Sequence, residues 1–199
     1  FNINVLKKYN LIPVLNNIED VKIWTNNVLK QESCIIHIDT GMNRLGLSYS
    51  DVSNIKYTNF LSKLNIKFIM THLACAEDKN NKMNEEQLKE FKKCTRILDK
   101  INKNPIKTSI CNSSGIWLGD KYLLDIVRPG AVFFGINPLL NRNNPLKEVI
   151  SLYAQITQIK KVSKNTSIGY GQTIKVKKDS LIGTISIGYS NGFARLLSN

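Results

Sequence analysis

The chain has 199 residues, 42% hydrophobic and 22% charged, so it can bury a domain-sized core and is not disordered by composition. No apolar run is long enough to span a bilayer and the start is no signal peptide, so we expect a cytoplasmic protein with no membrane partner. The net charge of +13 is spread over single lysines and pairs, so a solvated surface explains it better than nucleic-acid binding.

The cysteines indicate buried, reduced thiols rather than a metal site. They lie far apart and form no C-x-x-C pair: Cys34, Cys75, Cys94 and Cys111. Each stands in or beside an apolar run, as free cysteines of reducing compartments do. We therefore expect no metal.

Short β-rich runs alternate with segments of helical period through the first two thirds of the chain. The runs predict strands at residues 11–15, 34–38, 66–70, 107–111 and 132–134. Such alternation is typical of parallel strands with covering helices, in a barrel or a doubly wound sheet. Because each strand ends in a polar turn, we expect the chemistry at the carboxyl ends of the strands.

Three helices are predicted between these strands from apolar residues at helical spacing. The first carries Val21, Trp24 and Val28, the second carries Val52, Ile55 and Leu61, and the third carries Leu88, Phe91, Leu98 and Ile101. Asn84 and Gln87 have the spacing of a capping box at the start of the third helix.

A loop-rich linker at residues 137–145 separates two patterns. Beyond it, Leu152, Ala154 and Ile156 alternate with polar residues, and residues 181–187 repeat the alternation, which predicts antiparallel strands. We therefore expect one domain over residues 1–145 and the start of a mostly β domain over 146–199.

Polar residues stand at strand ends where folding alone does not require them. An arginine after a glycine turn, Arg44, suits a carboxylate, and the loops at residues 112–115 and 127–130 suit a phosphate. For each motif taken alone, an ordinary turn, a structural histidine or an exposed tyrosine is a fair alternative.

Taken together, the motifs resemble the alanine racemase family. The matching runs are DTGMNRLG (39–46), THLACA (71–76), NSSG (112–115), VRPG (127–130), GYG (169–171) and IGY (187–189). The resemblance implies a pyridoxal 5′-phosphate (PLP) enzyme that interconverts L-alanine and D-alanine, the latter for peptidoglycan. It also implies a partial (β/α)8 TIM-like barrel, with about five of eight strands, followed by a β domain.

The resemblance also implies roles for individual residues. Tyr170 matches the catalytic tyrosine that exchanges the substrate α-proton and, in that family, reaches the active site of the other subunit of a homodimer. His72 and Arg128 match residues that tune this tyrosine, and Arg128 also faces the pyridine nitrogen of PLP, where an arginine keeps its protons and weakens the electron sink.

Four further residues match binding positions of the family. Arg44 matches the arginine that contacts the substrate carboxylate, and Tyr189 matches a tyrosine at the substrate entrance. The Ser113 hydroxyl and the backbone N–H groups of Gly130 and Ala131 match the phosphate cradle.

The sequence departs from the family in one large respect. Nothing matches the segment with the Schiff-base lysine, and Lys7 and Lys8 precede the first strand rather than end it. We therefore expect a central piece of a longer protein that is inactive as given.

Two smaller departures lie within the motifs. His37 stands where many relatives have a lysine, carbamylated in some, that orients the substrate-binding arginine; a neutral imidazole can hydrogen-bond Arg44 but brings no negative charge. Asn191 stands where an aspartate is usual, which removes a carboxylate near the entrance.

Three alternatives stay open beside an active racemase. The first is a non-catalytic remnant of a racemase, the second is a related PLP-barrel decarboxylase or PLP carrier, and the third is a basic nucleic-acid-binding module. The glycine-flanked Tyr170 argues against the second, and the scattered charge argues against the third.

Overall fold

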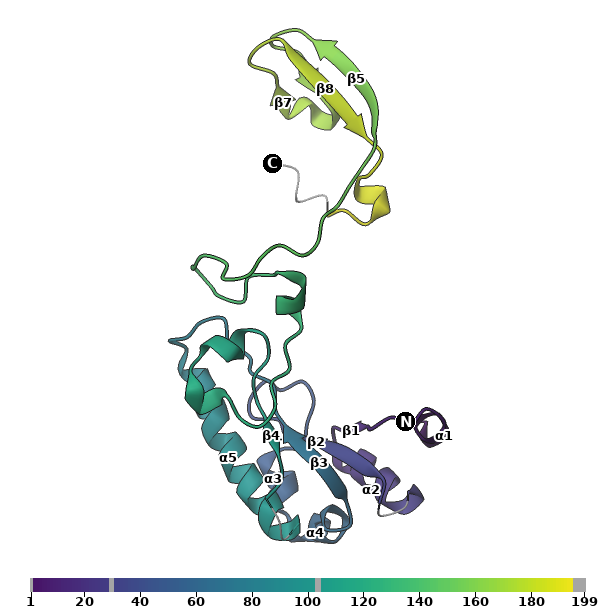
Figure 1. The fold of residues 1–199 in the computed structure, drawn as a ribbon, viewed down its shortest axis with the longest axis vertical. Helices are drawn as coiled ribbons and strands as arrows, with labels where there is room; N and C mark the ends of the chain where they lie inside the picture. Colours follow the sequence, from purple (N-terminus) through teal and green to yellow (C-terminus); the bar gives the residue numbers. More distant parts are fainter. Residues whose placement is uncertain (1, 29–30, 103–104, 195–199) are drawn as a thin grey trace. The chain divides into compact units, whose positions relative to one another are not determined.

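The computed structural model describes residues 2–28, 31–102 and 105–194, drawn in Figure 1. The chain divides into two compact units, Phe1–Val149 and Ile150–Asn199. In chain order, the first unit contains α1 (Ile3–Lys8), β1 (Val14–Leu15), α2 (Ile18–Asn27), β2 (Ser33–His37), α3 (Tyr49–Ser53), α4 (Ile55–Leu61), β3 (Asn65–Met70), α5 (Lys82–Asn102), β4 (Thr108–Ser109) and three 3-10 helices (Ser114–Trp117, Asp120–Tyr122 and Ala131–Phe134).

The four strands form one parallel sheet in the order β1-β2-β3-β4, as the alternating pattern predicts. His37 is level with Met70, and Met70 is level with Ser109. Because all strands run the same way, the turns that follow them emerge at a single edge of the sheet, here called the carboxyl edge.

The expected strand at residues 132–134 is wrong. Ala131–Phe134 forms a 3-10 helix, in which Phe133 N donates to Gly130 O at 3.1 Å and Gly135 N donates to Val132 O at 3.1 Å. An isolated parallel bridge joins Ser109 to Ile126, so the place beside β4 is taken earlier in the chain. A short β-rich run that finds no free strand edge to hydrogen-bond to forms local turns instead.

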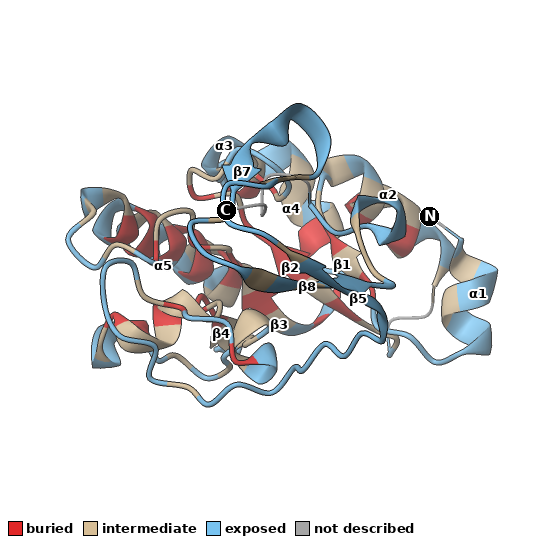
Figure 2. Cartoon of the chain, turned by 90° about the horizontal axis from the view of Figure 1, so that it is seen from above, coloured by how far each residue is buried: buried red, intermediate tan, exposed pale blue. Residues whose placement is uncertain are grey.

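The core lies between the sheet and its helices. Cys34, Ile36 and Ile38 are fully buried, whereas Ser33 and Ile35, which alternate with them, are only half-buried. One face of the sheet is therefore fully covered, and the core residues from the helices are Val21, Trp24, Val52, Leu61, Leu88, Phe91, Cys94 and Leu98. Figure 2 shows these buried positions along α5, α2 and the strands. This arrangement agrees with part of a helix-covered barrel.

The second predicted helix is two helices. Asn54 ends α3 and begins α4, where its side-chain oxygen accepts from Lys56 N at 3.0 Å. Ile55 is 84% exposed and does not belong to the apolar face. An asparagine that caps a new helix is enough to break a continuous apolar pattern.

The second unit contains antiparallel pairs of strands, as expected, but the run at residues 152–156 is wrong as a strand, because the strand begins only at Ile156. Strand β5 (Ile156–Val162) pairs with β8 (Ser180–Ile185), and β6 (Ser167–Ile168) pairs with β7 (Ile174–Lys175). Two 3-10 helices, Tyr170–Gln172 and Tyr189–Asn191, complete the unit. The large apolar side chains of the β5–β8 ribbon are mostly exposed: Ile156, Ile159, Leu181 and Ile185.

Candidate active site

Arg128 is held at the carboxyl edge by the ends of two strands. Its Nη2 donates to Thr71 O at 2.6 Å, and its Nη1 donates to the Ser109 hydroxyl. The Ser109 hydroxyl donates in turn to Ile126 O at 2.7 Å, and Arg128 N donates to Cys111 O at 3.0 Å. Because a guanidinium is planar and donates to two fixed acceptors, its orientation is more strongly restricted than that of a lysine ammonium group would be.

Two imidazoles lie within electrostatic range of this guanidinium. Burial lowers the pKa of His72, and the charges of Arg128 and Arg44 lower that pKa further. Burial, then Arg128 and His72, lowers the pKa of His37 to about 4, although Asp39 acts in the opposite direction. Both imidazoles are therefore neutral near pH 7, and the two guanidinium groups make the site positive.

The Ser113 hydroxyl lies across backbone N–H groups of the following loop. Gly130 N and Val132 N donate to Ser113 Oγ at 2.9 Å and 3.4 Å. A Cβ built on Gly130 meets no atom within 4 Å, so the space beside these donors is open. Converging N–H donors and a hydroxyl in a positive site are the groups that bind a phosphate. Val132 N is a further donor that the sequence did not indicate, and the predicted role of the Ala131 N–H group, which lies between the two donors in the chain, stays a prediction.

The predicted Arg44 turn is tight and its arginine is exposed. Asp39 Oδ1 accepts from Gly41 N at 2.9 Å and from Asn43 N at 3.1 Å. Gly46 has a φ of +117°, and a Cβ there would lie 2.5 Å from Asp39 N. The turn therefore requires glycine at residue 46 and presents Arg44 to solvent at the carboxyl edge.

The imidazole of His37 makes its hydrogen bond with Asn16. Asn16 Nδ2 donates to Val14 O at 3.1 Å, which leaves Asn16 Oδ1 to accept from His37 Nδ1 at 2.9 Å. Arg44 acts on His37 through its charge. The role of His37 as a hydrogen-bond partner of Arg44 stays a prediction.

The two predicted tyrosines belong to the second unit. Tyr170 is 87% exposed and lies between Gly169 and Gly171, whose φ angles are +71° and +67°. Tyr189 is also exposed, at the start of its 3-10 helix. The structure thus brings together His72, Arg128, Arg44 and Ser113 with its two N–H donors within the first unit, and both tyrosines belong to the second unit.

Asn191 closes a turn within the second unit. Its Oδ1 accepts from Gly188 N at 3.1 Å and from the Ser190 hydroxyl at 3.3 Å. An amide oxygen makes the same cap that a carboxylate would make, so the departure at this position keeps the local turn.

Lys7 lies at the other end of the sheet. Its Nζ donates to Asn27 O at 3.3 Å and lies 3.6 Å from the Glu32 carboxylate, just before β2 begins. Lys7 therefore lies at the amino ends of the strands, whereas the Schiff-base lysine of the family follows the carboxyl end of a strand.

Gln87 and Asn84 do not form the predicted capping box. Both are buried inside α5, and the first turn is bound instead by Asn81, whose Oδ1 accepts from Met83 N at 3.0 Å. The Gln87 amide reaches the loops that carry the site, and Thr71 and Ser109 hold Arg128. The sequence did not indicate a role at the site for Gln87, Thr71 or Ser109. The available signal was a polar residue, Gln87, next to Leu88 on the apolar face of the predicted helix.

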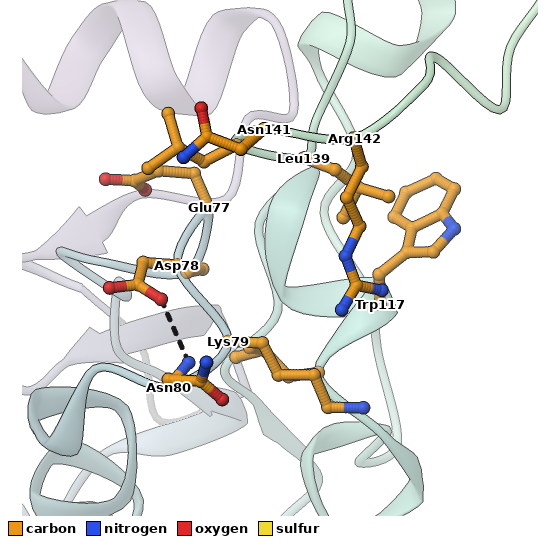
Figure 3. Close-up of a pocket in the computed structure, with 11 residues that line it drawn as sticks. Glu77, Asp78, Lys79, Asn80, Trp117, Leu139, Asn141 and Arg142 are labelled. Carbon is orange, nitrogen blue, oxygen red and sulfur yellow. Dashed lines mark hydrogen bonds between the residues drawn. The ribbon is translucent and has the colours of Figure 1, made fainter.

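A separate pocket of about 270 Å³ lies beside the loop that follows β3, shown in Figure 3. Asp78, Lys79, Trp117, Leu139 and Arg142 are among its lining residues. None of the predicted site residues lines it. Charges of both signs surround it, so it lacks the positive character of the Arg128 site.

Three further features bear on the expectations from sequence. Among residues 2–28, 31–102 and 105–194, no three His, Cys, Asp or Glu side chains are grouped to hold a metal ion. No helix in these ranges is long and apolar enough to cross a membrane. The cysteines are free thiols, and all except the half-buried Cys75 are buried.

The first unit is thus a parallel α/β fold that holds a fixed arginine, a serine hydroxyl and backbone N–H groups at the carboxyl edge of its sheet. Family models for the alanine racemase N-terminal domain and C-terminal domain match residues 2–138 and 149–199. The chain therefore belongs to the alanine racemase family, which confirms the resemblance.

Relatives in the family agree along nearly the whole chain. The alanine racemases of Rickettsia bellii and Rickettsia canadensis are 41% and 40% identical over 98% of this chain, which covers 47% and 53% of theirs. The Bartonella henselae alanine racemase, solved with covalently bound pyridoxal phosphate, matches 98% of this chain and 54% of its own at 32% identity and a TM-score of 0.78. The Pseudomonas aeruginosa biosynthetic enzyme matches 97% and 54% at 25% identity and 0.80. The chain thus spans about half the length of the curated relatives it matches.

Proposed function

We propose that the protein containing this chain is a PLP-dependent alanine racemase that supplies D-alanine for peptidoglycan. In this proposal, residues 1–145 belong to the cofactor-binding barrel and residues 146–199 begin the β domain. The observation that carries the proposal is the Ser113 hydroxyl across Gly130 N and Val132 N, beside an Arg128 fixed on two strand ends.

The residues of the site fit the cofactor. The N–H groups at residues 130–132 and the Ser113 hydroxyl would hold its phosphate, and Arg128 would face its ring nitrogen. When bound, PLP supplies an electron sink for the bonds at the substrate α-carbon. Arg128 keeps its protons near neutral pH, so it would donate a hydrogen bond to the ring nitrogen without giving up a proton, which would weaken the electron sink and disfavour side reactions.

The chain's own residues would move and hold the remaining charges. Arg44 binds the substrate carboxylate through its guanidinium. Tyr170 of the partner subunit takes or gives the α-proton, which gives a homodimer with a shared site. A phenol has a pKa near 10, so the neutral His72 and the cationic Arg128 must stabilise its phenolate.

Kinetics of the complete protein test this proposal. Tyr170→Phe removes the proton carrier and should lower kcat for racemisation by roughly 10²-fold to 10⁴-fold. Tyr153→Phe is the matched control, because Tyr153 is 88% exposed in the same unit and has no assigned role. Equal activity of the two variants would contradict the assignment of Tyr170.

A further inference from the structure

The amide of Gln87 is fully buried in the first unit, on the second turn of α5. Its helix neighbours on the covered face, Leu88 and Phe91, are apolar core residues. A buried amide is costly unless its donors and acceptor are all satisfied, so an apolar residue of the same size would fit this face more cheaply. A glutamine at this position therefore points to a specific set of partners.

The Gln87 amide has three partners, in the loops that follow β2 and β3. Its Oε1 accepts from Ala74 N at 2.9 Å, and its Nε2 donates to His72 O at 2.8 Å and to the Thr40 hydroxyl at 3.1 Å. Two of these bonds bracket the backbone of residues 72–74. The third joins the loop after β2 to the same side chain.

The contacts continue to Arg128. The Thr40 and Thr71 hydroxyl groups lie 2.8 Å apart, both in buried residues, and Thr71 O accepts from Arg128 Nη2. One connected set of hydrogen bonds therefore links α5 to His72 on one side and to Arg128 on the other. A buried set of this kind fixes its members only when it is complete.

We propose that Gln87 is a positioning residue whose amide ties the loops after β2 and β3 together and thereby fixes His72 and Arg128. This inference rests on the proposed function, in which those two residues tune the proton carrier and face the cofactor. Gln87 lies behind the loops and acts through their backbone. It is a positioning residue, not a catalytic one.

The test compares Gln87→Met with Asn84→Leu in the complete protein that contains this chain, because PLP binding is proposed for that protein. Gln87→Met keeps the volume and removes all three hydrogen bonds. Asn84 is also buried on α5, but its amide donates to Cys75 O and Asp78 O, which lie later in the loop after β3 than His72, and among the described residues it makes no hydrogen bond to the loop after β2. Circular dichroism first establishes that each variant folds.

Two readouts separate positioning from stability. This chain contains two histidines, His37 and His72, and NMR follows their imidazoles separately once His37→Gln and His72→Gln variants have assigned the signals. Gln87→Met should move the His72 pKa toward its ordinary value near 6.5 and weaken PLP binding by about 10-fold to 100-fold. Asn84→Leu should change neither.

A folded Gln87→Met variant with the His72 titration and PLP affinity of the parent protein would overturn the proposal. If that variant does not fold, Thr40→Val replaces it, since it removes the hydroxyl that contacts both Gln87 Nε2 and Thr71 without adding a charge, and the same two readouts decide. Failure of the complete parent protein to bind PLP would contradict the proposed function, and the His72 titration would still decide the role of Gln87.

Discussion

Acidification should destabilise the first unit through His37. This imidazole is 6% exposed, and its pKa falls from 6.5 to about 4, chiefly through burial and then the charge of Arg128. Above pH 6.5 the imidazole is neutral in both the folded and the unfolded chain. As the pH falls toward 4, the unfolded chain binds a proton that the folded chain does not, so the stability present at neutral pH is lost.

The size of the effect follows from the two pKa values. Each unit of difference is worth about 1.4 kcal/mol, so the full loss between neutral pH and pH 4 is about 3 kcal/mol. Between pH 8 and pH 5 the expected loss from this single group is about 2 kcal/mol.

The assay is urea unfolding followed by tryptophan fluorescence at pH 8, 7, 6 and 5. Both tryptophans, Trp24 and Trp117, lie in the first unit, so the signal reports on that unit. Because carboxylates also titrate in acid, the measured quantity is the difference between the parent chain and His37→Gln. A pH dependence that is the same in both proteins would refute the reasoning.

Two further predictions concern the turns that build the site. Gly46→Ala should lower the free energy of unfolding by about 2 kcal/mol more than Gly119→Ala does. Both glycines have φ near +118°, but only a Cβ at Gly46 would clash with Asp39 N. Thermal unfolding of both variants measures the difference, and equal losses would contradict the prediction. In the complete protein, Ser113→Ala should weaken PLP binding by about tenfold, because one hydrogen bond to the phosphate is lost. The free energy of unfolding should change by less than about 1 kcal/mol. A fluorescence titration with PLP measures the affinity, and an unchanged affinity would contradict the role of Ser113 in phosphate binding.

The strands and the site motifs could be predicted because their signals are local. Residues 34–38 and 66–70 are β-rich runs that end in polar turns, and the structure has β2 and β3 there. Arg128 stands out in the sequence because it follows an apolar run and precedes Pro129. These features depend on near neighbours in the chain.

The rest depends on distant residues. Whether residues 132–134 form a strand depends on whether a neighbouring strand is available, and Ile126 already occupies the place beside β4. Gln87 has the spacing of a cap, and only the three-dimensional contacts with Thr40, His72 and Ala74 reveal its role. Long-range polar contacts leave no periodic signal in a sequence.

The most direct test of the central claim is proton exchange at the α-carbon of alanine. The complete protein is incubated with PLP and L-alanine in D₂O, and NMR and chiral chromatography follow the α-proton and the enantiomers. The account predicts loss of the α-proton signal, accumulation of D-alanine to equal amounts, and loss of both effects in Tyr170→Phe. A PLP-loaded protein that exchanges no α-proton, or a Tyr170→Phe variant that forms D-alanine at the parent rate, would contradict it.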